Sequence, residues 1–438
     1  MNHATTSYPD AFLGRMQLLL GDEFPAFIES LGQPSPTSLR LNPKKRISKF
    51  DSEEKISWCE EGRYLAQRPS FTFDPLFHAG TYYVQEASSM FVEQVWKQVN
   101  PNKEAVKVLD MCAAPGGKST HLLSLMDGKG VLVSNELLPH RNRILQQNII
   151  KWGYPNCIIT QNKAEDFAAL ENYFDLVLID APCSGEGLFR KDKEAIDEWS
   201  ERNVAICAQR QKDILNSAYR CLKPGGFLIY STCTFEAEEN DENMKRLGVG
   251  SWEIAVEQPG ITKTNYGYQF FPHKVKGEGF YISVFKKEGD WVPNFEVSAP
   301  SAQLQNPDFL QSPEDFAEIK KNDLFFAIPK TIHNDFLFLE KQLYIRNVGI
   351  CMGTMKGKDF LPAHDLALSI AIGKDIPSVE LNNEEAIAYL RGETPKIKSA
   401  YRGWCLATFE EKNLGWMKLM PNRWNNYYPK EYRILKQK

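Results

Sequence analysis

The stretch VKVLDMCAAPGGKST, residues 106–120, decides the fold of this 438-residue chain. A run rich in β-branched residues ends at Asp110, adjacent glycines follow at Gly116 and Gly117, and a segment with helical spacing comes next. This order predicts a buried strand, a tight turn and a helix. Small residues in such a turn let the backbone approach a ligand closely, and the helix N-terminus favours an anionic group.

The region after this stretch continues the alternation of strands and helices. Four further apolar runs lie between residues 131 and 230, with helically spaced segments such as 141–152 between most of them. This pattern predicts an α/β fold with a parallel sheet covered on both faces. In such sheets the ligand crevice lies outside the carboxyl ends of the strands. The polar residues expected there are Asp110, Asn135, Glu136, Asn162, Asp180, Ser231 and Thr232.

Composition narrows the class of protein. Hydrophobic residues make up 42% of the chain and charged residues 25%, which excludes a disordered or fibrous protein. The net charge of -4 argues against a globally basic nucleic-acid binder but leaves a local basic face open. No run approaches the ~18 apolar residues of a membrane span, no signal peptide is visible, and the nine cysteines form no Cys-x-x-Cys. We expect a cytoplasmic monomer without a metal ion.

The glycine turn alone leaves its ligand open. It matches neither the Gly-x-x-x-x-Gly-Lys-Ser/Thr phosphate loop nor the Gly-x-Gly-x-x-Gly dinucleotide motif, and a plain strand–helix connection is the bland alternative. Glu136 ends the next predicted strand, about twenty residues past the glycines, where an acid can accept hydrogen bonds from ribose hydroxyls. A nucleoside-containing ligand is therefore favoured.

Two cysteines stand just past the ends of predicted strands. Cys183 lies in DAPCSGEG, residues 180–187, and Cys233 lies in STCT, residues 231–234. A buried cysteine is usually a small hydrophobe, and a disulfide between these two would be rare in the cytosol. Two cysteines at neighbouring strand ends, flanked by small and polar residues, better fit a nucleophile exposed to a substrate.

Together these motifs resemble the Nol1/Nop2/Sun family of AdoMet-dependent RNA (cytosine-5)-methyltransferases. The resemblance spans roughly residues 35–287 and includes SLRLNP at 38–43, YVQEASS at 83–89 and EEN at 238–240. The tail, from residue 388 to 430, looks like the C-terminal extension of bacterial RsmF-type ribosomal RNA methyltransferases. The resemblance implies a Rossmann-like domain with a mostly parallel, seven-stranded sheet, a small N-terminal domain and a β-rich, PUA-like C-terminal domain.

The resemblance also implies roles for single residues. Cys233 corresponds to the nucleophile that attacks carbon 6 of cytosine, Cys183 to the cysteine that assists release, and Asp180 to a contact near the cytosine edge. Asn162 stands where the family commonly has an aspartate, although its amide oxygen can still accept a hydrogen bond from adenine. The implied AdoMet contacts are Cys112, Ala113, Ala114, Pro115, Gly116, Gly117, Lys118, Glu136, Asn162 and Asp180.

RNA is the expected partner. We predict an N-terminal RNA-binding or substrate subdomain at 1–95, a catalytic domain at 96–288, a linker at 289–313 and a C-terminal RNA-binding domain at 314–438. Residues 381–438 contain eleven Lys/Arg and six Glu with nine interleaved aromatics, which suits phosphate contacts and base stacking. Candidate RNA contacts elsewhere are Arg40, Arg190 and Lys191, each of which could equally be a solvated charge.

Methylation of small-subunit ribosomal RNA at cytosine carbon 5 is the favoured function. The same reaction on transfer RNA is a close alternative, and a non-catalytic RNA-binding ribosome assembly factor is an alternative of another class. A nicotinamide-dependent oxidoreductase could use a similar sheet, but it would leave Cys183 and Cys233 unexplained.

Overall fold

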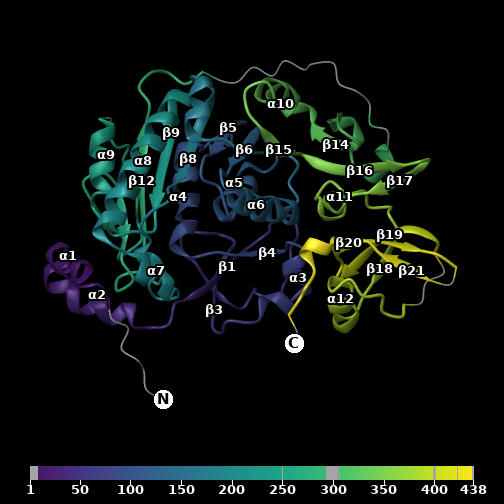
Figure 1. Ribbon diagram of the computed structural model, residues 1–438, viewed down its shortest axis with the longest axis horizontal. Helices are drawn as coiled ribbons and strands as arrows, with labels where there is room; N and C mark the ends of the chain where they lie inside the picture. Colours follow the sequence, from purple (N-terminus) through teal and green to yellow (C-terminus); the bar gives the residue numbers. More distant parts are fainter. Residues whose placement is uncertain are drawn as a thin grey trace.

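The computed structural model describes residues 8–248, 250–292, 304, 306–397, 401–421 and 423–436. A large central sheet lies between the N-terminal helices, drawn in purple, and the C-terminal part, drawn in green and yellow (Figure 1). In the described parts of the chain, no helix combines the length and apolar character that a membrane span requires.

The central sheet is mixed and has nine strands in the order β10-β11-β12-β9-β8-β5-β6-β7-β15. The five strands from β9 to β7 run parallel to one another, whereas the strands at both edges are antiparallel. The expected α/β methyltransferase-type sheet is confirmed, but it has nine strands instead of seven because β10 and β15 extend its edges. The strands are β5 (Lys107–Asp110), β6 (Val131–Asn135), β7 (Cys157–Thr160), β8 (Phe174–Asp180), β9 (Leu222–Thr232), β10 (Thr262–Lys263), β11 (Tyr268–Phe270), β12 (Phe280–Lys286) and β15 (Ile345–Val348).

Alternate residues of the parallel strands enter two separate cores, as the period of two in a strand requires. Val108 and Leu178 pack with α4, α5 and α6, whereas Leu109 and Val177 pack with α8 and with the C-terminal helix α10. Helices thus cover both faces, as the continuous apolar runs predict. The helices of this region are α4 (Val92–Val99), α5 (Gly117–Met126), α6 (Pro139–Trp152), α7 (Lys193–Glu198), α8 (Glu201–Cys221) and α9 (Asp241–Leu247), and α10 spans His333–Leu339.

The N-terminal part begins with two helices, which are followed by a small antiparallel sheet and a third, short helix. Phe12 and Phe27, one from each helix, pack against Phe189, Trp199 and Phe235, which belong to segments following β8 and β9. The N-terminal helices therefore buttress the loops at the carboxyl ends of these strands. The elements are α1 (Asp10–Leu20), α2 (Phe24–Leu31), a sheet of β2 (Glu54–Lys55), β3 (Gly62–Leu65), β1 (Thr37–Leu41) and β4 (Tyr82–Val84), and the short helix α3 (Pro75–His78).

The C-terminal part contains two four-stranded sheets and also contributes β15 to the central sheet. β15 pairs antiparallel with β7, so this part is joined to the sheet by backbone hydrogen bonds. About half of the predicted linker, 293–303 and 305, lies outside the described residues. The elements are β13 (Phe316–Lys321), β14 (Leu324–Pro329), β16 (Ile350–Lys356), β17 (Asp359–Pro362) and α11 (His364–Leu368), followed by β18 (Ser378–Glu380), α12 (Asn383–Leu390), β19 (Gly403–Phe409), β20 (Lys412–Leu419) and β21 (Trp424–Asn426).

Candidate active site

A cleft of about 350 Å³ opens at the carboxyl ends of β5 and β8. Its volume lies within the usual range for small-molecule sites. Segments far apart in the sequence form its walls. Residues lining it are Tyr83, Val84, Gln85, Glu86, Ser89, Asp110, Cys112, Ala113, Ala114, Pro115, Gly117, Lys118, Asp180, Ala181, Gly187, Leu188, Lys191, Cys233, Glu278, Gly279 and Phe280.

The glycine turn forms one wall of the cleft. It follows β5 directly, and α5 begins at Gly117. Gly116 has a φ of +111°, a conformation that residues with a Cβ rarely adopt. Of the seven predicted turn residues, Gly116 alone does not line the cleft; it shapes the turn instead. The turn places backbone groups and the N-terminus of α5 beside the cleft, as the sequence predicts.

Asp180 and Lys118 form an ion pair inside the cleft, with 2.7 Å between Oδ1 and Nζ. The hydroxyl of Ser231 donates to Asp180 Oδ1 at 2.9 Å, and Lys118 Nζ lies 5.2 Å from the centre of the Phe280 ring. The side chain of Asp180 is 38% exposed, so it can still meet a ligand. The cleft therefore presents one anion and one cation side by side.

Further acidic groups surround the turn. Burial raises the pKa of Asp110 to about 7, against the opposing effect of the hydrogen bond from Ser119. Burial also raises the pKa of Cys112, and the charges of Asp110, Glu136 and Asp180 add to the rise. Three carboxyl groups thus act on this one thiol. Such an environment suits a ligand that carries a positive charge, and Lys118 suits a carboxylate on the same ligand.

Cys183 and Cys233 are free thiols whose sulfur atoms lie 3.2 Å apart. Cys233 lines the cleft, and Cys183 lies behind it. The backbone N–H of Cys233 donates to the Cys183 sulfur at 3.4 Å. Contact with Cys233, followed by burial, raises the pKa of Cys183. The structure thus brings together the two cysteines that the sequence singles out.

Glu136 and Asn162 lie at the ends of β6 and β7, but neither lines the cleft. Glu136 accepts from the backbone N–H of Leu138 and pairs with Arg141 at 3.3 Å. Both ends of the Asn162 amide are bonded to the backbone of Tyr344, at 3.0 and 3.1 Å. The Asn162 side chain therefore anchors the segment before β15, and its expected contact with adenine stays a prediction. A cofactor contact by Glu136 stays a prediction.

Arg40 is not on an RNA-facing surface, which corrects the expectation for this residue. Its side chain is 1% exposed and lies over the ring of Trp152. Its guanidinium donates to Gln85 Oε1, to Gly117 O and to Thr120 Oγ1 at 3.0, 3.1 and 2.7 Å. Arg40 therefore braces the glycine turn from inside the protein.

Arg190 and Lys191 lie close to the cleft. Arg190 donates to Pro34 O and Gly277 O, both at 2.7 Å, and so joins the N-terminal segment to the turn before β12. Lys191 lines the cleft and pairs with Glu278. RNA contacts by these two residues stay predictions.

The sequence motifs gave no role to several residues that line the cleft. Tyr83, Gln85 and Glu86 come from the YVQEASS stretch, which contributes to the family resemblance but carries no obvious chemistry. Gly279 and Phe280 come from the start of β12. The sequence feature that could have pointed to this wall is the glycine just before an apolar strand. In the structure Gly279 has a φ of +133°, which residues with a Cβ rarely adopt.

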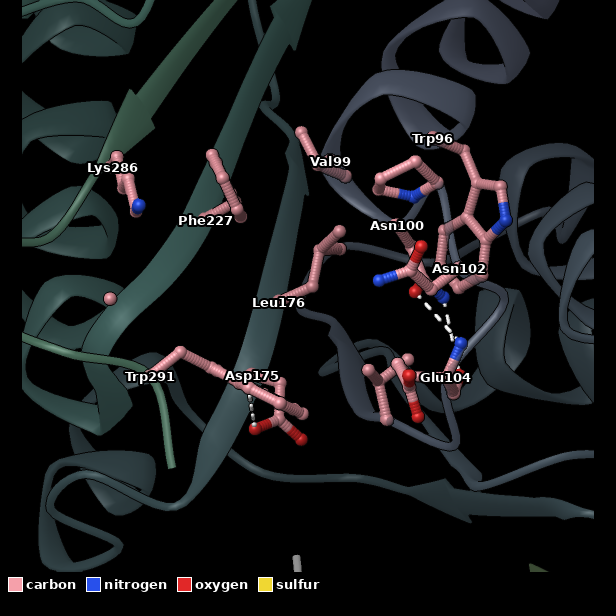
Figure 2. A pocket seen from close by; sticks show the side chains of 13 residues that line it. Trp96, Val99, Asn100, Asn102, Glu104, Asp175, Leu176, Phe227, Lys286 and Trp291 are labelled. Atoms are coloured by element: carbon pink, nitrogen blue, oxygen red, sulfur yellow. Dashed lines mark hydrogen bonds between the residues drawn. The ribbon is translucent and has the colours of Figure 1, made fainter. Parts of the chain in front are cut away.

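A second hollow, of about 210 Å³, lies near the amino ends of the parallel strands, opposite the cleft. Figure 2 shows Trp96, Phe227 and Trp291 around it, with Asp175 at the amino end of β8. None of the predicted site residues lines this hollow. Its lining contains no cysteine, and it is the weaker candidate for group-transfer chemistry.

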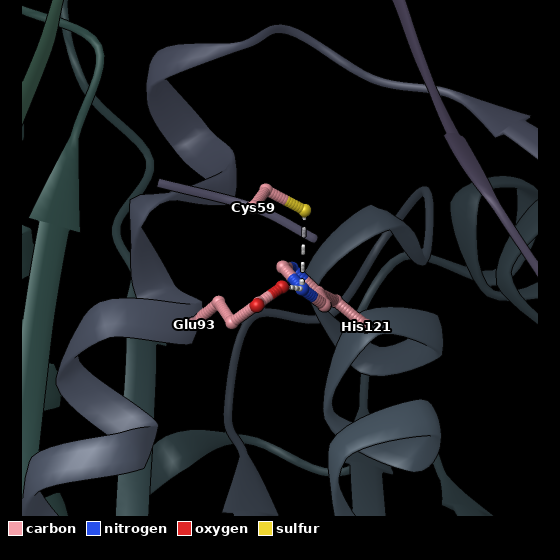
Figure 3. Close-up of side chains that lie close together, drawn as sticks. All are labelled: Cys59, Glu93 and His121. Atoms are coloured by element: carbon pink, nitrogen blue, oxygen red, sulfur yellow. Dashed lines mark hydrogen bonds and ion pairs between the residues drawn. The ribbon is translucent and has the colours of Figure 1, made fainter. Parts of the chain in front are cut away.

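Within the described ranges, one group has the chemistry of a metal site: Cys59, Glu93 and His121. Figure 3 shows the three side chains pointing toward one another, with His121 Nε2 3.1 Å from Glu93 Oε2 and 3.8 Å from Cys59 Sγ. Lys97 already pairs with Glu93 at 2.8 Å. His121 Nδ1 is buried without a partner, whereas a metal-bound histidine normally donates this second N–H. The three side chains already contact one another and Lys97, and the absence of a metal ion stays a prediction.

Comparisons with known proteins agree with this geometry. The family described as 16S rRNA methyltransferase RsmB/F matches residues 97–286, the N-terminal domain of 16S rRNA methyltransferase RsmF matches 8–87, and the methyltransferase RsmF PUA domain matches 376–434. Ribosomal RNA small subunit methyltransferase F from Vibrio cholerae is 31% identical, and that from Vibrio atlanticus 30%, each over 98% of both chains. A methyltransferase homolog from Pyrococcus horikoshii has a solved structure that is 28% identical, with a TM-score of 0.56 over 64% of this chain and 96% of that chain.

Proposed function

This chain belongs to the RsmB/F family of 16S rRNA methyltransferases, and we propose that it methylates carbon 5 of a cytosine in small-subunit ribosomal RNA. The observation that carries the proposal is the pair of thiols of Cys183 and Cys233, 3.2 Å apart, one of them facing the cleft. Covalent chemistry on a pyrimidine requires a nucleophile that faces the substrate, and the Cys233 thiol is placed to serve as one.

Cys233 is the nucleophile. Carbon 5 of cytosine is a poor nucleophile because the ring is aromatic and electron-poor. When the Cys233 thiolate forms a bond to carbon 6, carbon 5 gains the electron density to attack a methyl group. The proton given up by the Cys233 thiol passes to the ring nitrogen as this density develops, and Asp180, which lies in the same cleft, accepts a hydrogen bond from that N–H.

AdoMet is the cofactor, and it supplies an electrophilic methyl group on a sulfonium centre. The cleft fits such a molecule because acidic groups surround the turn and Lys118 stands beside them. The residues that would hold it are the turn from Cys112 to Lys118 together with Asp180. Glu136 would reach the ribose hydroxyls from the end of β6.

Cys183 acts in the release of product. After methyl transfer, a solvent water takes the proton from carbon 5, the electron pair of that C–H bond restores the double bond between carbons 5 and 6, and the carbon 6–sulfur bond breaks to leave the Cys233 thiolate. Cys183 keeps its proton within 3.2 Å of the Cys233 sulfur, so it can donate that proton to the departing thiolate. Release of the proton on the ring nitrogen then restores the Cys183 thiol.

The substrate base must be unpaired or flipped out, since the Cys233 sulfur cannot reach carbon 6 of a base that is stacked inside a helix. The C-terminal domain, with its excess of Lys and Arg and its interleaved aromatics, is the proposed RNA-binding unit. Some of these aromatics build its core instead, because Trp416 is only 1% exposed. We expect the protein to act on RNA in the cytoplasm as a monomer.

The test is to incubate the purified protein with methyl-labelled AdoMet and with small ribosomal subunits, 16S rRNA or transfer RNA in parallel. We expect 5-methylcytosine in the ribosomal RNA, at a position found by bisulfite sequencing. Label in transfer RNA alone would favour the alternative substrate. RNA binding without any methyl transfer would favour the non-catalytic assembly factor.

A further inference from the structure

Backbone hydrogen bonds on both sides of Cys183 hold the two thiols of the cleft close together. Cys183 lies in the loop after β8 and Cys233 in the loop after β9, and β8 and β9 are parallel neighbours. The N–H of Ala181 donates to Ser231 O at 2.8 Å, and the N–H of Gly187 donates to Cys233 O at 2.8 Å. The two loops are therefore joined both before and after Cys183.

The sulfur atoms of the pair are close enough to bond after a small movement. They belong to free thiols and lie 3.2 Å apart, whereas the sulfurs of a disulfide are about 2.05 Å apart. The backbone N–H of Cys233 donates to the Cys183 sulfur at 3.4 Å, so the Cys183 side chain already points toward its neighbour. A shift of roughly 1 Å would therefore bring the two sulfurs to bonding distance.

Cys233 is the thiol of the pair that a small oxidant reaches from the cleft. Cys233 lines the cleft, whereas Cys183 does not. A peroxide attacks the thiolate form of a cysteine, so a thiol that keeps its proton reacts slowly. Burial raises the pKa of the seven cysteines outside the pair, which are Cys59, Cys112, Cys157, Cys207, Cys221, Cys351 and Cys405. Oxidation should therefore be selective for Cys233.

We propose that Cys183 and Cys233 form a reversible redox pair, which a peroxide closes into a disulfide and a thiol reductant reopens. The peroxide first transfers one oxygen to the Cys233 thiolate, which gives a sulfenic acid and a hydroxide ion. The Cys183 sulfur then bonds to the Cys233 sulfur, and the hydroxyl group leaves with the Cys183 proton as water. In the sum, two thiols lose two electrons and two protons, and one peroxide is reduced to two waters.

The disulfide would be an inactive but recoverable form of the protein. It removes the nucleophile and the proton donor of release at the same time, a consequence that rests on the proposed function. It also protects Cys233 from oxidation beyond the sulfenic acid, which is irreversible in most proteins. Disulfides in the cytosol are usually transient and often sense the redox state. The pair thus fits a modification site for small peroxides.

The first arm of the test detects the bond itself and needs no RNA. The reduced full-length protein is treated with hydrogen peroxide, alkylated, digested and analysed by mass spectrometry. We expect one cross-linked peptide that joins Cys183 to Cys233, a fall in free thiols from nine to seven, and reversal by dithiothreitol. Absence of this link, a link between two copies of the chain, or sulfinic acid at Cys233 before any link forms would overturn the proposal.

Two variants test the role of Cys183 in the same assay. Cys183→Ala leaves Cys233 without a partner, so peroxide should produce a sulfenic acid that dimedone traps and that excess peroxide oxidises irreversibly. Cys207→Ala is the matched control, because the charge of Cys233 also acts on the Cys207 thiol. It should form the link as wild type does. Equal protection of Cys233 in the Cys183→Ala variant, or loss of the link in Cys207→Ala, would contradict the proposal.

The second arm measures methyl transfer by the oxidised protein. The rate should fall at least about tenfold on oxidation, because the nucleophile is no longer a thiolate, and dithiothreitol should restore it. AdoMet binding, measured by calorimetry, should persist, because Asp180 and Lys118 keep their ion pair. Loss of AdoMet binding, or full activity of the cross-linked protein, would contradict the proposal. If the reduced protein methylates no RNA, the proposed function fails, and the peptide link still decides whether the redox pair exists.

Discussion

A hollow lies at each end of the parallel strands, and the residues that line the two hollows differ in chemistry. At the carboxyl ends, Cys233, Asp180 and Lys118 face a cleft. At the amino ends, the hollow in Figure 2 is lined by Trp96, Phe227 and other residues without a thiol. A hollow is thus a candidate active site only if reactive side chains line it. In this type of sheet, the loops at the carboxyl ends of the strands supply those side chains.

The acids at the two edges illustrate this contrast. Asp175, at the amino end of β8, accepts from Lys223 Nζ at 2.8 Å and from Trp291 Nε1 at 2.9 Å, and it is 3% exposed. Asp180, at the carboxyl end of the same strand, keeps 38% of its side chain exposed beside Lys118. Asp175 therefore makes structural contacts inside the protein, whereas Asp180 can still contact a ligand.

The most severe test of the comparison is Cys233→Ala at the carboxyl edge. Loss of the nucleophile should reduce methyl transfer at least about a thousandfold, while AdoMet binding, measured by calorimetry, should persist. Cys405→Ala, which removes a buried thiol from β19, is the matched control and should stay active. Substantial residual transfer by the Cys233 variant would remove this residue from the nucleophile role.

Cys183→Ala should slow release rather than attack. Without the proton donor beside Cys233, the protein–RNA adduct should accumulate, and turnover should fall about a hundredfold. A shifted band on a denaturing gel measures the adduct. The double variant with Cys233→Ala should form none, and a single variant that turns over without adduct would contradict the release role.

Asp110→Asn tests the acidity of the carboxyl edge through stability. The pKa of Asp110 is raised to about 7 in the folded protein, so the unfolded chain loses this proton first as pH rises. Wild type should therefore lose stability relative to Asp110→Asn between about pH 4 and pH 7, by on the order of 3 kcal/mol. Urea unfolding without ligand at pH 4.5 and 8 measures the difference. The exposed Asp127→Asn is the control, and a difference that does not vary with pH would contradict the buried ionisation.

The smallest effect on activity is expected at the amino edge. Trp291→Ala removes the hydrogen bond to Asp175 and part of the wall of the hollow in Figure 2. The melting temperature should fall by a few degrees, and methyl transfer should stay within about twofold of wild type because no reacting group lies there. A tenfold loss of transfer by a folded variant would break the contrast between the two edges.

Sequence patterns predicted most of the residues that meet at the carboxyl ends of the parallel strands. The alternation of apolar runs and helical segments placed Asp110, Asp180 and the two cysteines at strand ends, and the parallel strands bring those ends together. The glycine turn follows β5 as predicted. These features depend on local periodicity and on one topological rule, so a single sequence carries them.

Long-range contacts explain what the sequence could not predict. Nothing near Arg40 indicates that its partners are Gln85, Gly117 and Thr120. Asn162 has the right place in the pattern, yet a segment 182 residues away takes its amide. The contact between Ser184 and Glu239 likewise depends on two loops meeting in space, since the two residues are 55 positions apart in the sequence.

The pairing of β15 with β7 makes the C-terminal part a strand donor to the catalytic sheet. A fragment ending before residue 314 would lose that donated strand and uncover the backbone N–H and C=O groups along the open side of β7. Bare strand edges recruit other chains. Truncation would therefore replace the pairing of β7 with β15 by an exposed strand edge, to which other chains can add. The shortened protein should therefore self-associate instead of behaving as a smaller enzyme.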